Sequence, residues 1–245
     1  MAILHQMINF LLPPRCIATG EIVNDQGMVS PTVWRDLNFI SDPKCDSCGF
    51  PFDFDIEGLN DGHLCASCMK YPPQYNQARA ALIYDDASRD IVLGFKHGDQ
   101  THAVPTFMPW LLQAGRELLK ETDYLVPVPL HPTRLIRRRF NQSALIAKYL
   151  SKETGVKTVL NALTRLRATP TQGHLDMKER KKNVRKAFQV APRYIERLKG
   201  KNIILVDDVY TTGATVNECT KELLKCDVNS VSILTLARVV KPEKF

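Results

Sequence analysis

Residues 203–215 read IILVDDVYTTGAT, and this stretch decides the fold that we expect. Residues 203–206 and Val209 form an aliphatic run that predicts a strand buried in a parallel sheet. Asp207 and Asp208 mark the carboxyl end of that strand, and small polar residues follow as a turn. A helical pattern of apolar residues begins at Ala214. The stretch therefore predicts a strand–loop–helix unit with two carboxylates at its turning point.

The loop of this unit has the composition of an anion site, with the residues Thr211, Thr212, Gly213, Ala214 and Thr215. Unpaired N–H groups and the helix dipole both favour negative charge at a helix N-terminus. The adjacent carboxylates would accept hydrogen bonds from sugar hydroxyls, so a sugar phosphate is the expected ligand. The alternative is a solvated Asp pair followed by an ordinary capped helix.

The order of these residues, VDDVYTTGAT, resembles the phosphoribosyl-pyrophosphate (PRPP) motif of the type I phosphoribosyltransferases. The resemblance implies that Asp207 and Asp208 hold the ribose hydroxyls, directly or through Mg²⁺. It also implies that the loop holds the 5′-phosphate. The corresponding reaction is displacement of pyrophosphate at C1 of the ribose.

Composition indicates an ordinary globular protein of 245 residues, with 44% hydrophobic and 24% charged residues. No run of about 18 apolar residues predicts a membrane span. The N-terminus lacks the basic region of a signal peptide. Seven cysteines beside a nucleotide-type site favour a reducing cytoplasm, and metal binding rather than disulfides.

Four of these cysteines form two CxxC pairs, Cys45 with Cys48 and Cys65 with Cys68. Two such pairs at this spacing predict a zinc ribbon, in which each turn supplies two thiolates. Gly49 follows the first pair, where a knuckle favours a residue that tolerates positive φ. The alternatives are redox-active pairs or buried free cysteines.

Charge is unevenly distributed along the chain. Residues 131–201 contain 19 Lys and Arg against 4 Asp and Glu, whereas residues 1–130 contain 9 against 16. The basic middle segment predicts a surface that faces anions. No internal repeat is visible in the sequence.

The remaining pattern predicts an α/β fold, with a parallel sheet of about five strands, helices on both faces and the ligand at the carboxyl ends of the strands. We expect a basic loop after the strand at 124–130. The first half of residues 169–188 is expected to form a mobile loop. Expected strands are 78–84, 124–130, 159–164, 187–190, 203–206 and 231–237; expected helices are 2–12, 91–97, 106–119 and 141–150. We divide the chain into an N-terminal helical or irregular segment (1–44), a zinc ribbon (45–73) and a phosphoribosyltransferase-like domain (74–245).

A wider set of motifs is similar to the competence-associated ComF family. It comprises the CxxC pairs, YPP, FKHG, VPVPLHPTR, RRRFNQS, TQGHLDMKERKKNVRKAF and VDDVYTTGATV, within residues 45–238. The segment 169–188 also resembles the catalytic loop of glutamine amidophosphoribosyltransferases. That likeness implies that Gln172, Arg180 and Arg185 close over pyrophosphate, and that Pro129, His131 and Arg134 belong to a pyrophosphate loop.

The chain departs from that family at its start. Many members carry two further CxxC pairs before the ribbon, whereas here Cys16 has Thr19 in place of its partner. We therefore expect a single structural Zn²⁺.

Two functions remain open from the sequence. The first is a phosphoribosyltransferase-like protein that binds PRPP or a related ribose phosphate with Mg²⁺. The second is a non-catalytic factor that handles single-stranded DNA in uptake or recombination, working with the helicase machinery of DNA uptake. Arg137, Arg138 and Arg139 would then contact backbone phosphates.

Overall fold

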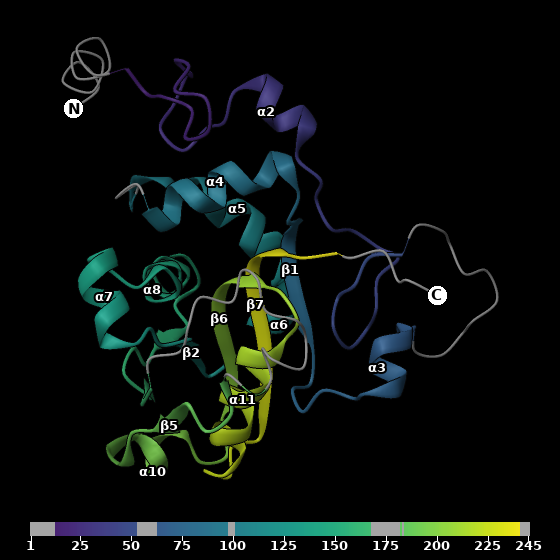
Figure 1. Ribbon diagram of the computed structural model, residues 1–245, viewed down its shortest axis with the longest axis vertical. Coiled ribbons are helices and arrows are strands. Elements are labelled where there is room, and N and C mark those ends of the chain that lie inside the picture. The colour runs from purple at the N-terminus through teal and green to yellow at the C-terminus, as the bar shows by residue number, and fades with distance from the viewer. Residues whose placement is uncertain (1–12, 53–62, 98–100, 168–181, 183, 241–245) are drawn as a thin grey trace.

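The computed structural model describes residues 13–240 except 53–62, 98–100, 168–181 and 183 (Figure 1). The helix expected at residues 2–12 and most of the loop expected at 169–188 lie outside the described residues. Within the described part, no helix is both long and apolar enough to cross a membrane.

The centre of the molecule is a five-stranded, all-parallel sheet in the order β1-β7-β6-β2-β3. Its strands are β1 (Ala78–Ile83), β2 (Tyr124–Pro127), β3 (Lys157–Thr158), β6 (Asn202–Tyr210) and β7 (Ser230–Arg238). The predicted sheet is confirmed. Strand β6 runs beyond its expected end, so the two aspartates lie within it.

Side chains of β6 alternate between two hydrophobic cores, as the pleat of a strand requires. Ile203 and Leu205 face one core, which also contains α11 (Ala214–Leu224) and the four ribbon cysteines. Ile204 and Val206 face the other, beside α4 (Asp86–His97), α5 (Val104–Ala114) and α8 (Gln142–Thr154). Helices thus cover both faces of the sheet (Figure 1).

Three expectations about the elements are wrong. The helix expected at 106–119 is divided at Gly115 into α5 and α6 (Arg116–Lys120). The segment after β2 is not a basic loop but a helix, α7 (Pro132–Arg138), because His131 caps it and a proline suits its first turn. The strand expected at 159–164 is replaced by β4 (Leu163–Arg165), which pairs antiparallel with β5 (Phe188–Val190) outside the main sheet.

The N-terminal residues contact the domain at several places, among them the bridge between Phe39 and Leu82 of β1. Helix α2 (Pro31–Asp36) lies near α5, where the rings of Trp34 and Trp110 are 6.2 Å apart. The ribbon and its helix α3 (Ala66–Lys70) lie beyond β1 (Figure 1), and Ala78 N donates to Ser47 O at 2.7 Å. The short helices η1 (Thr101–Ala103), η3 (Pro192–Tyr194) and α10 (Ile195–Leu198) complete the described elements.

Candidate functional site

The two aspartates lie where the sheet opens. Strand β6 pairs with β2 only as far as Val206, which faces Pro127, whereas its pairing with β7 continues to Tyr210. Asp207 and Asp208 therefore follow directly after the point at which β2 leaves the sheet. Crevices of this kind, at the carboxyl ends of diverging strands, are where open α/β sheets bind ligands.

Asp207 is fixed by hydrogen bonds to one of its oxygens. Its Oδ1 accepts from Ser143 Oγ and from Asp208 N, both at 2.9 Å. Burial and repulsion from the Asp208 carboxylate raise the pKa of Asp207 to about 7, and those two hydrogen bonds oppose the shift. Asp207 is thus an oriented acceptor whose charge changes near neutral pH.

Asp208 is paired with a lysine that sequence reasoning missed. Lys96 Nζ lies 3.1 Å from Asp208 Oδ2, and both side chains are largely buried. Lys96 belongs to the FKHG motif at the end of α4, and its carbonyl accepts from Gln142 Nε2 at 3.2 Å. The lysine balances the negative charge of Asp208 at the site.

The segment NQS of the RRRFNQS motif connects three parts of this site. Asn141 caps α8 and donates from Nδ2 to Val128 O at 3.0 Å, Gln142 bonds Lys96, and Ser143 bonds Asp207. Three consecutive residues at one helix N-terminus thus hold the β2 loop, α4 and β6 together. The motif itself was visible in the sequence, but the partners of its residues depend on tertiary contacts.

The loop after β6, residues 211–215, is the candidate anion cradle. Gly213 has φ +72°, and α11 begins at Ala214 as predicted, without a side-chain cap from the described residues. A Cβ at Gly213 would lie 2.3 Å from Tyr210 Oη, so only glycine fits. Thr212 Oγ1 is buried and has no hydrogen-bond partner among the described residues. Thr106, Thr220 and Thr235 have hydroxyls in the same state among the described residues, but of the four only Thr212 lies in the loop after β6, where a ligand oxygen would satisfy it.

Two arginines from different elements interact electrostatically, and one of them also interacts with Asp207. Arg134 lies in α7, and burial followed by repulsion from Arg138 lowers its pKa. Arg165 is buried at the end of β4. Its pKa is lowered by burial and then by repulsion from Arg134, and the carboxylate of Asp207 opposes this shift. The charge of Arg165 is therefore influenced by both Arg134 and Asp207. Arg165 had no role in the sequence interpretation.

The other residues expected at the site are only partly described. Pro129 and His131 follow β2, and His131 Nδ1 accepts from Thr133 N at 3.3 Å. Gln172 and Arg180 lie outside the described residues. Arg185 is exposed, and Lys186 beside it donates from N to Glu218 Oε1 on α11 at 2.6 Å.

The three arginines expected to contact DNA lie at the end of α7 rather than in a loop. Arg138 donates from Nη1 to Gln142 Oε1 at 3.4 Å, and Arg139 ends the helix with φ +65°. Arg137 also belongs to the helix.

The four cysteines of the ribbon form one cluster. Their sulfurs all lie within 4.8 Å of one another, and Cys48 Sγ lies 3.6 Å from Cys65 Sγ. Tetrahedral zinc with Zn–S bonds of about 2.3 Å places its sulfurs about 3.8 Å apart, so the donor set fits Zn²⁺. Hydrogen bonding to Cys45 and Cys48, followed by burial, raises the pKa of Cys65. Without a cation this thiol therefore keeps its proton, and four thiolates this close together require a positive charge between them, which Zn²⁺ would supply. The donor set predicted for the zinc ribbon is confirmed.

A chain of contacts joins the ribbon to the anion cradle. Arg238, at the end of β7, donates to Cys48 O and lies over the Tyr210 ring, 4.7 Å from its centroid. Tyr210 Oη is 2.8 Å from Tyr75 Oη and packs against Gly213. The zinc knuckle thus supports the tyrosine that shapes the loop.

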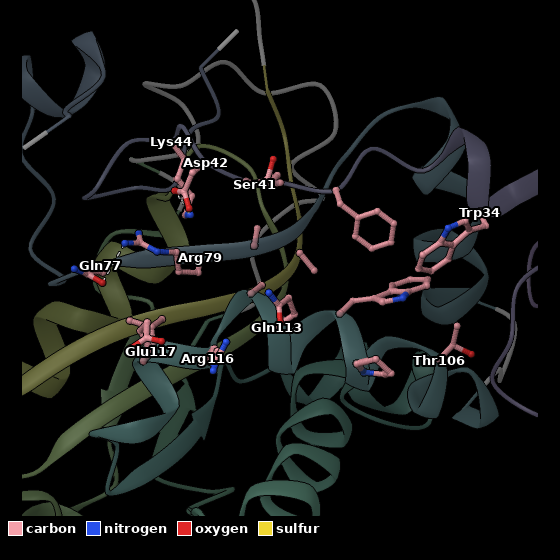
Figure 2. A pocket seen from close by; sticks show the side chains of 18 of the residues that line it. Trp34, Ser41, Asp42, Lys44, Gln77, Arg79, Thr106, Gln113, Arg116 and Glu117 are labelled. Carbon is pink, nitrogen blue, oxygen red and sulfur yellow. Dashed lines mark hydrogen bonds and ion pairs between the residues drawn. The ribbon is translucent and has the colours of Figure 1, made fainter. Parts of the chain in front are cut away.

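A large groove of about 1170 Å³ lies beside β1, lined by residues of α2, β1 and α5 and by neither aspartate of the acidic pair. Figure 2 shows Trp34 at one end of it and Asp42, Lys44 and Arg79 at the other. None of the residues of the strand–loop–helix unit line it. Its size therefore does not make it the ribose site.

Comparison with known proteins identifies two parts in this chain, a zinc ribbon and a phosphoribosyltransferase domain. The family model "Double zinc ribbon domain" matches residues 7–69, and "Phosphoribosyl transferase domain" matches residues 136–244. Competence protein F of Haemophilus influenzae is 30% identical over 201 residues, which cover 80% of this chain and 85% of that protein. DNA utilization protein YhgH of Escherichia coli K12 is 30% identical over 80% of this chain and 84% of its own length. Competence protein ComFC of Bacillus subtilis is 28% identical over 66% of this chain and 64% of its own length. With its zinc ribbon and its phosphoribosyltransferase domain, the chain belongs to the ComF/YhgH-like family.

Proposed function

We propose that this chain binds a phosphorylated ribose, PRPP or ribose 5-phosphate, together with Mg²⁺ at the carboxyl end of β6. One observation carries the proposal: the acidic pair, the partnerless Thr212 hydroxyl and the N-terminus of α11 lie within residues 207–215. Carboxylates suit ribose hydroxyls, and a helix N-terminus suits a phosphate.

The expected position of the ribose follows from the free acceptor groups. Asp207 Oδ1 accepts two internal hydrogen bonds, which orient the carboxylate so that its other oxygen can accept from a ribose hydroxyl. Asp208 supplies the second acceptor. The 5′-phosphate would take hydrogen bonds from Thr212 Oγ1 and from the first N–H groups of α11, which lack intrahelical partners.

The donor chemistry also fits Mg²⁺, which proteins hold through one or two carboxylates together with substrate oxygens. Asp208 would contact the ion. Lys96 Nζ, which lies 3.1 Å from Asp208 Oδ2, would compete with Mg²⁺ for that carboxylate. When bound, Mg²⁺ would neutralise charge on pyrophosphate. Arg134, Arg180 and Arg185 would do so from the protein side, and Gln172 would donate a hydrogen bond to the same group; the roles of Gln172, Arg180 and Arg185 remain predictions.

With an acceptor present, the reaction would break the C1–O bond to pyrophosphate and form a bond from C1 to the acceptor. The residues described here bind and orient the ribose and balance the charge of the leaving group. Positioning and electrostatic stabilisation of this kind are the main means of catalysis for such displacements.

Calorimetric titration of the full chain with PRPP and with ribose 5-phosphate tests this proposal. Binding should be lost in the Asp207→Asn/Asp208→Asn double variant and retained in Asp86→Asn/Asp90→Asn. The second pair removes the same charge from exposed positions on α4. Equal affinities in the wild type and the first variant would show that the pocket is misassigned.

Single-stranded DNA is the second candidate ligand. It is favoured by the names of relatives, competence protein F and DNA utilization protein YhgH, and by the basic segment 131–201. Replacing Arg137, Arg138 and Arg139 with Ala should weaken DNA binding and flatten its salt dependence, by about 0.7 in the log–log slope per lost phosphate contact. Replacing the exposed Lys148, Lys152 and Lys157 removes equal charge and serves as the control. Salt-independent binding by the wild type would exclude this candidate.

A further inference from the structure

Residues 14–23 have the backbone of the zinc knuckle at residues 43–52. In the knuckle, Cys45 N donates to Phe50 O at 2.7 Å, Gly49 N to Cys45 O at 2.8 Å, and Phe52 N to Pro43 O at 2.9 Å. The N-terminal copy has the same three bonds, each shifted by 29 residues: Cys16 N to Glu21 O at 2.7 Å, Gly20 N to Cys16 O at 2.9 Å, and Val23 N to Pro14 O at 2.9 Å. Both turns also have an antiparallel bridge and a glycine at positive φ.

The second half of the ribbon is repeated as well. Cys65 precedes α3 with φ −70° and ψ 156°, and Ser30 precedes α2 with φ −64° and ψ 153°. Met69 N donates to Cys65 O at 3.0 Å, and Trp34 N to Ser30 O at 2.9 Å. This half is shifted by 35 residues, so the loop inside the N-terminal copy is six residues shorter.

The sulfur of Cys16 shares the positions of two backbone hydrogen-bond donors with that of Cys45. Cys45 Sγ accepts from Cys48 N at 3.5 Å and from Cys65 N at 3.3 Å. Cys16 accepts from the N–H groups of Thr19 and Ser30, which are the equivalent positions; it also accepts from Ala18 N and the Thr19 hydroxyl. The two copies therefore agree in the hydrogen bonds around their first ligand position.

The other three ligand positions of the N-terminal copy do not fit a metal. The shifts place Thr19 where Cys48 stands, Ser30 where Cys65 stands, and Val33 where Cys68 stands. Thr19 Oγ1 lies 3.2 Å from Glu21 Oε2, Ser30 Oγ lies 2.9 Å from Thr32 Oγ1, and Val33 has no donor atom. We propose that residues 14–36 are a zinc ribbon that has lost its metal and keeps its fold without it.

Packing against the domain takes over the role of the metal. Val33, in the last ligand position, packs against the core that contains α4 and α5, as do Ile17 and Leu37. Trp34 adds a ring contact with Trp110 of α5. The double ribbon therefore consists of one copy held by Zn²⁺ and one copy held by apolar contacts.

Metal analysis of the purified full chain tests this inference. The wild type should retain one zinc per chain after dialysis against a weak chelator, and the triple variant Thr19→Cys/Ser30→Cys/Val33→Cys should retain two. Adding Cys16→Ala to the triple variant should return the count to one. Two zinc ions in the wild type, or one in a folded triple variant, would overturn the inference.

Hydrogen exchange on the wild type gives an independent test if the triple variant does not fold. Removing zinc should expose the amides of Cys45, Gly49 and Phe52 while those of Cys16, Gly20 and Val23 stay protected. Equal loss of protection in both copies would contradict a metal-free N-terminal ribbon.

Discussion

Replacing Gly213 with Ala should damage the anion cradle in a way that the structure specifies. The residue has φ +72°, which costs an L-residue about 1–2 kcal/mol. The new Cβ would also lie 2.3 Å from Tyr210 Oη, which is buried and bonded to Tyr75. Moving that hydroxyl breaks a hydrogen bond with a net value of about 0.5–1.5 kcal/mol. The total loss of unfolding free energy is about 2.5 kcal/mol, or roughly 8 °C in Tm for a chain of this size.

Gly155→Ala provides the matched control. Its φ is +77°, but nothing lies within 4 Å of the added Cβ, so it should lose only about 1–2 kcal/mol and keep its ligand affinity. Gly213→Ala should in addition lower ribose 5-phosphate affinity at least tenfold. Tyr210→Phe in the Gly213→Ala background should recover part of the stability, because it removes the nearest atom but leaves Tyr210 Cζ 2.8 Å away. Equal stability losses at the two glycines, with unchanged affinity, would refute this reasoning.

Three further predictions concern the ribbon and the acidic pair. Cys45→Ser should lower the zinc content and make the ribbon sensitive to proteases, because structural zinc supplies folding energy. Cys16→Ser should leave one zinc bound. Metal analysis and limited proteolysis of the two variants test this prediction. Arg238→Met should weaken ribose 5-phosphate binding in calorimetry although Arg238 does not belong to the cradle, because it removes the link from Cys48 O to Tyr210; unchanged affinity would disprove that coupling. The raised pKa of Asp207, about 7, means that its contribution to stability is fully present below the unfolded value of about 3.9 and is lost as pH rises through 7. Asp207→Asn should therefore reduce the fall in urea stability between pH 5 and pH 8, and an unchanged fall would argue against the buried charge.

Local patterns were sufficient to predict the centre of this fold. Residues 203–206 form a continuous aliphatic run because β6 is covered on both faces, and small residues after it leave a helix start at Ala214. The CxxC spacing likewise identified the zinc cluster. In each case the residues that carry the information are neighbours in the sequence.

Other parts of the site depend on contacts between distant segments. Lys96 and Ser143 reach the acidic pair from α4 and α8, and no local pattern states which carboxylate each one meets. The metal-free ribbon was hidden for another reason: three of its four ligand positions have changed, and its halves are shifted by different numbers of residues. Helix α7 was predicted as a basic loop after the strand at 124–130, whereas His131 and Pro132 start a helix there.

A crystal structure of the full chain with ribose 5-phosphate and Mg²⁺ tests the central claim most directly. The phosphate should lie against Thr212 Oγ1 and the first N–H groups of α11, with the ribose hydroxyls at Asp207 and Asp208. A ligand bound instead in the groove beside Trp34, or a cradle without ligand at saturating concentration, would contradict the claim.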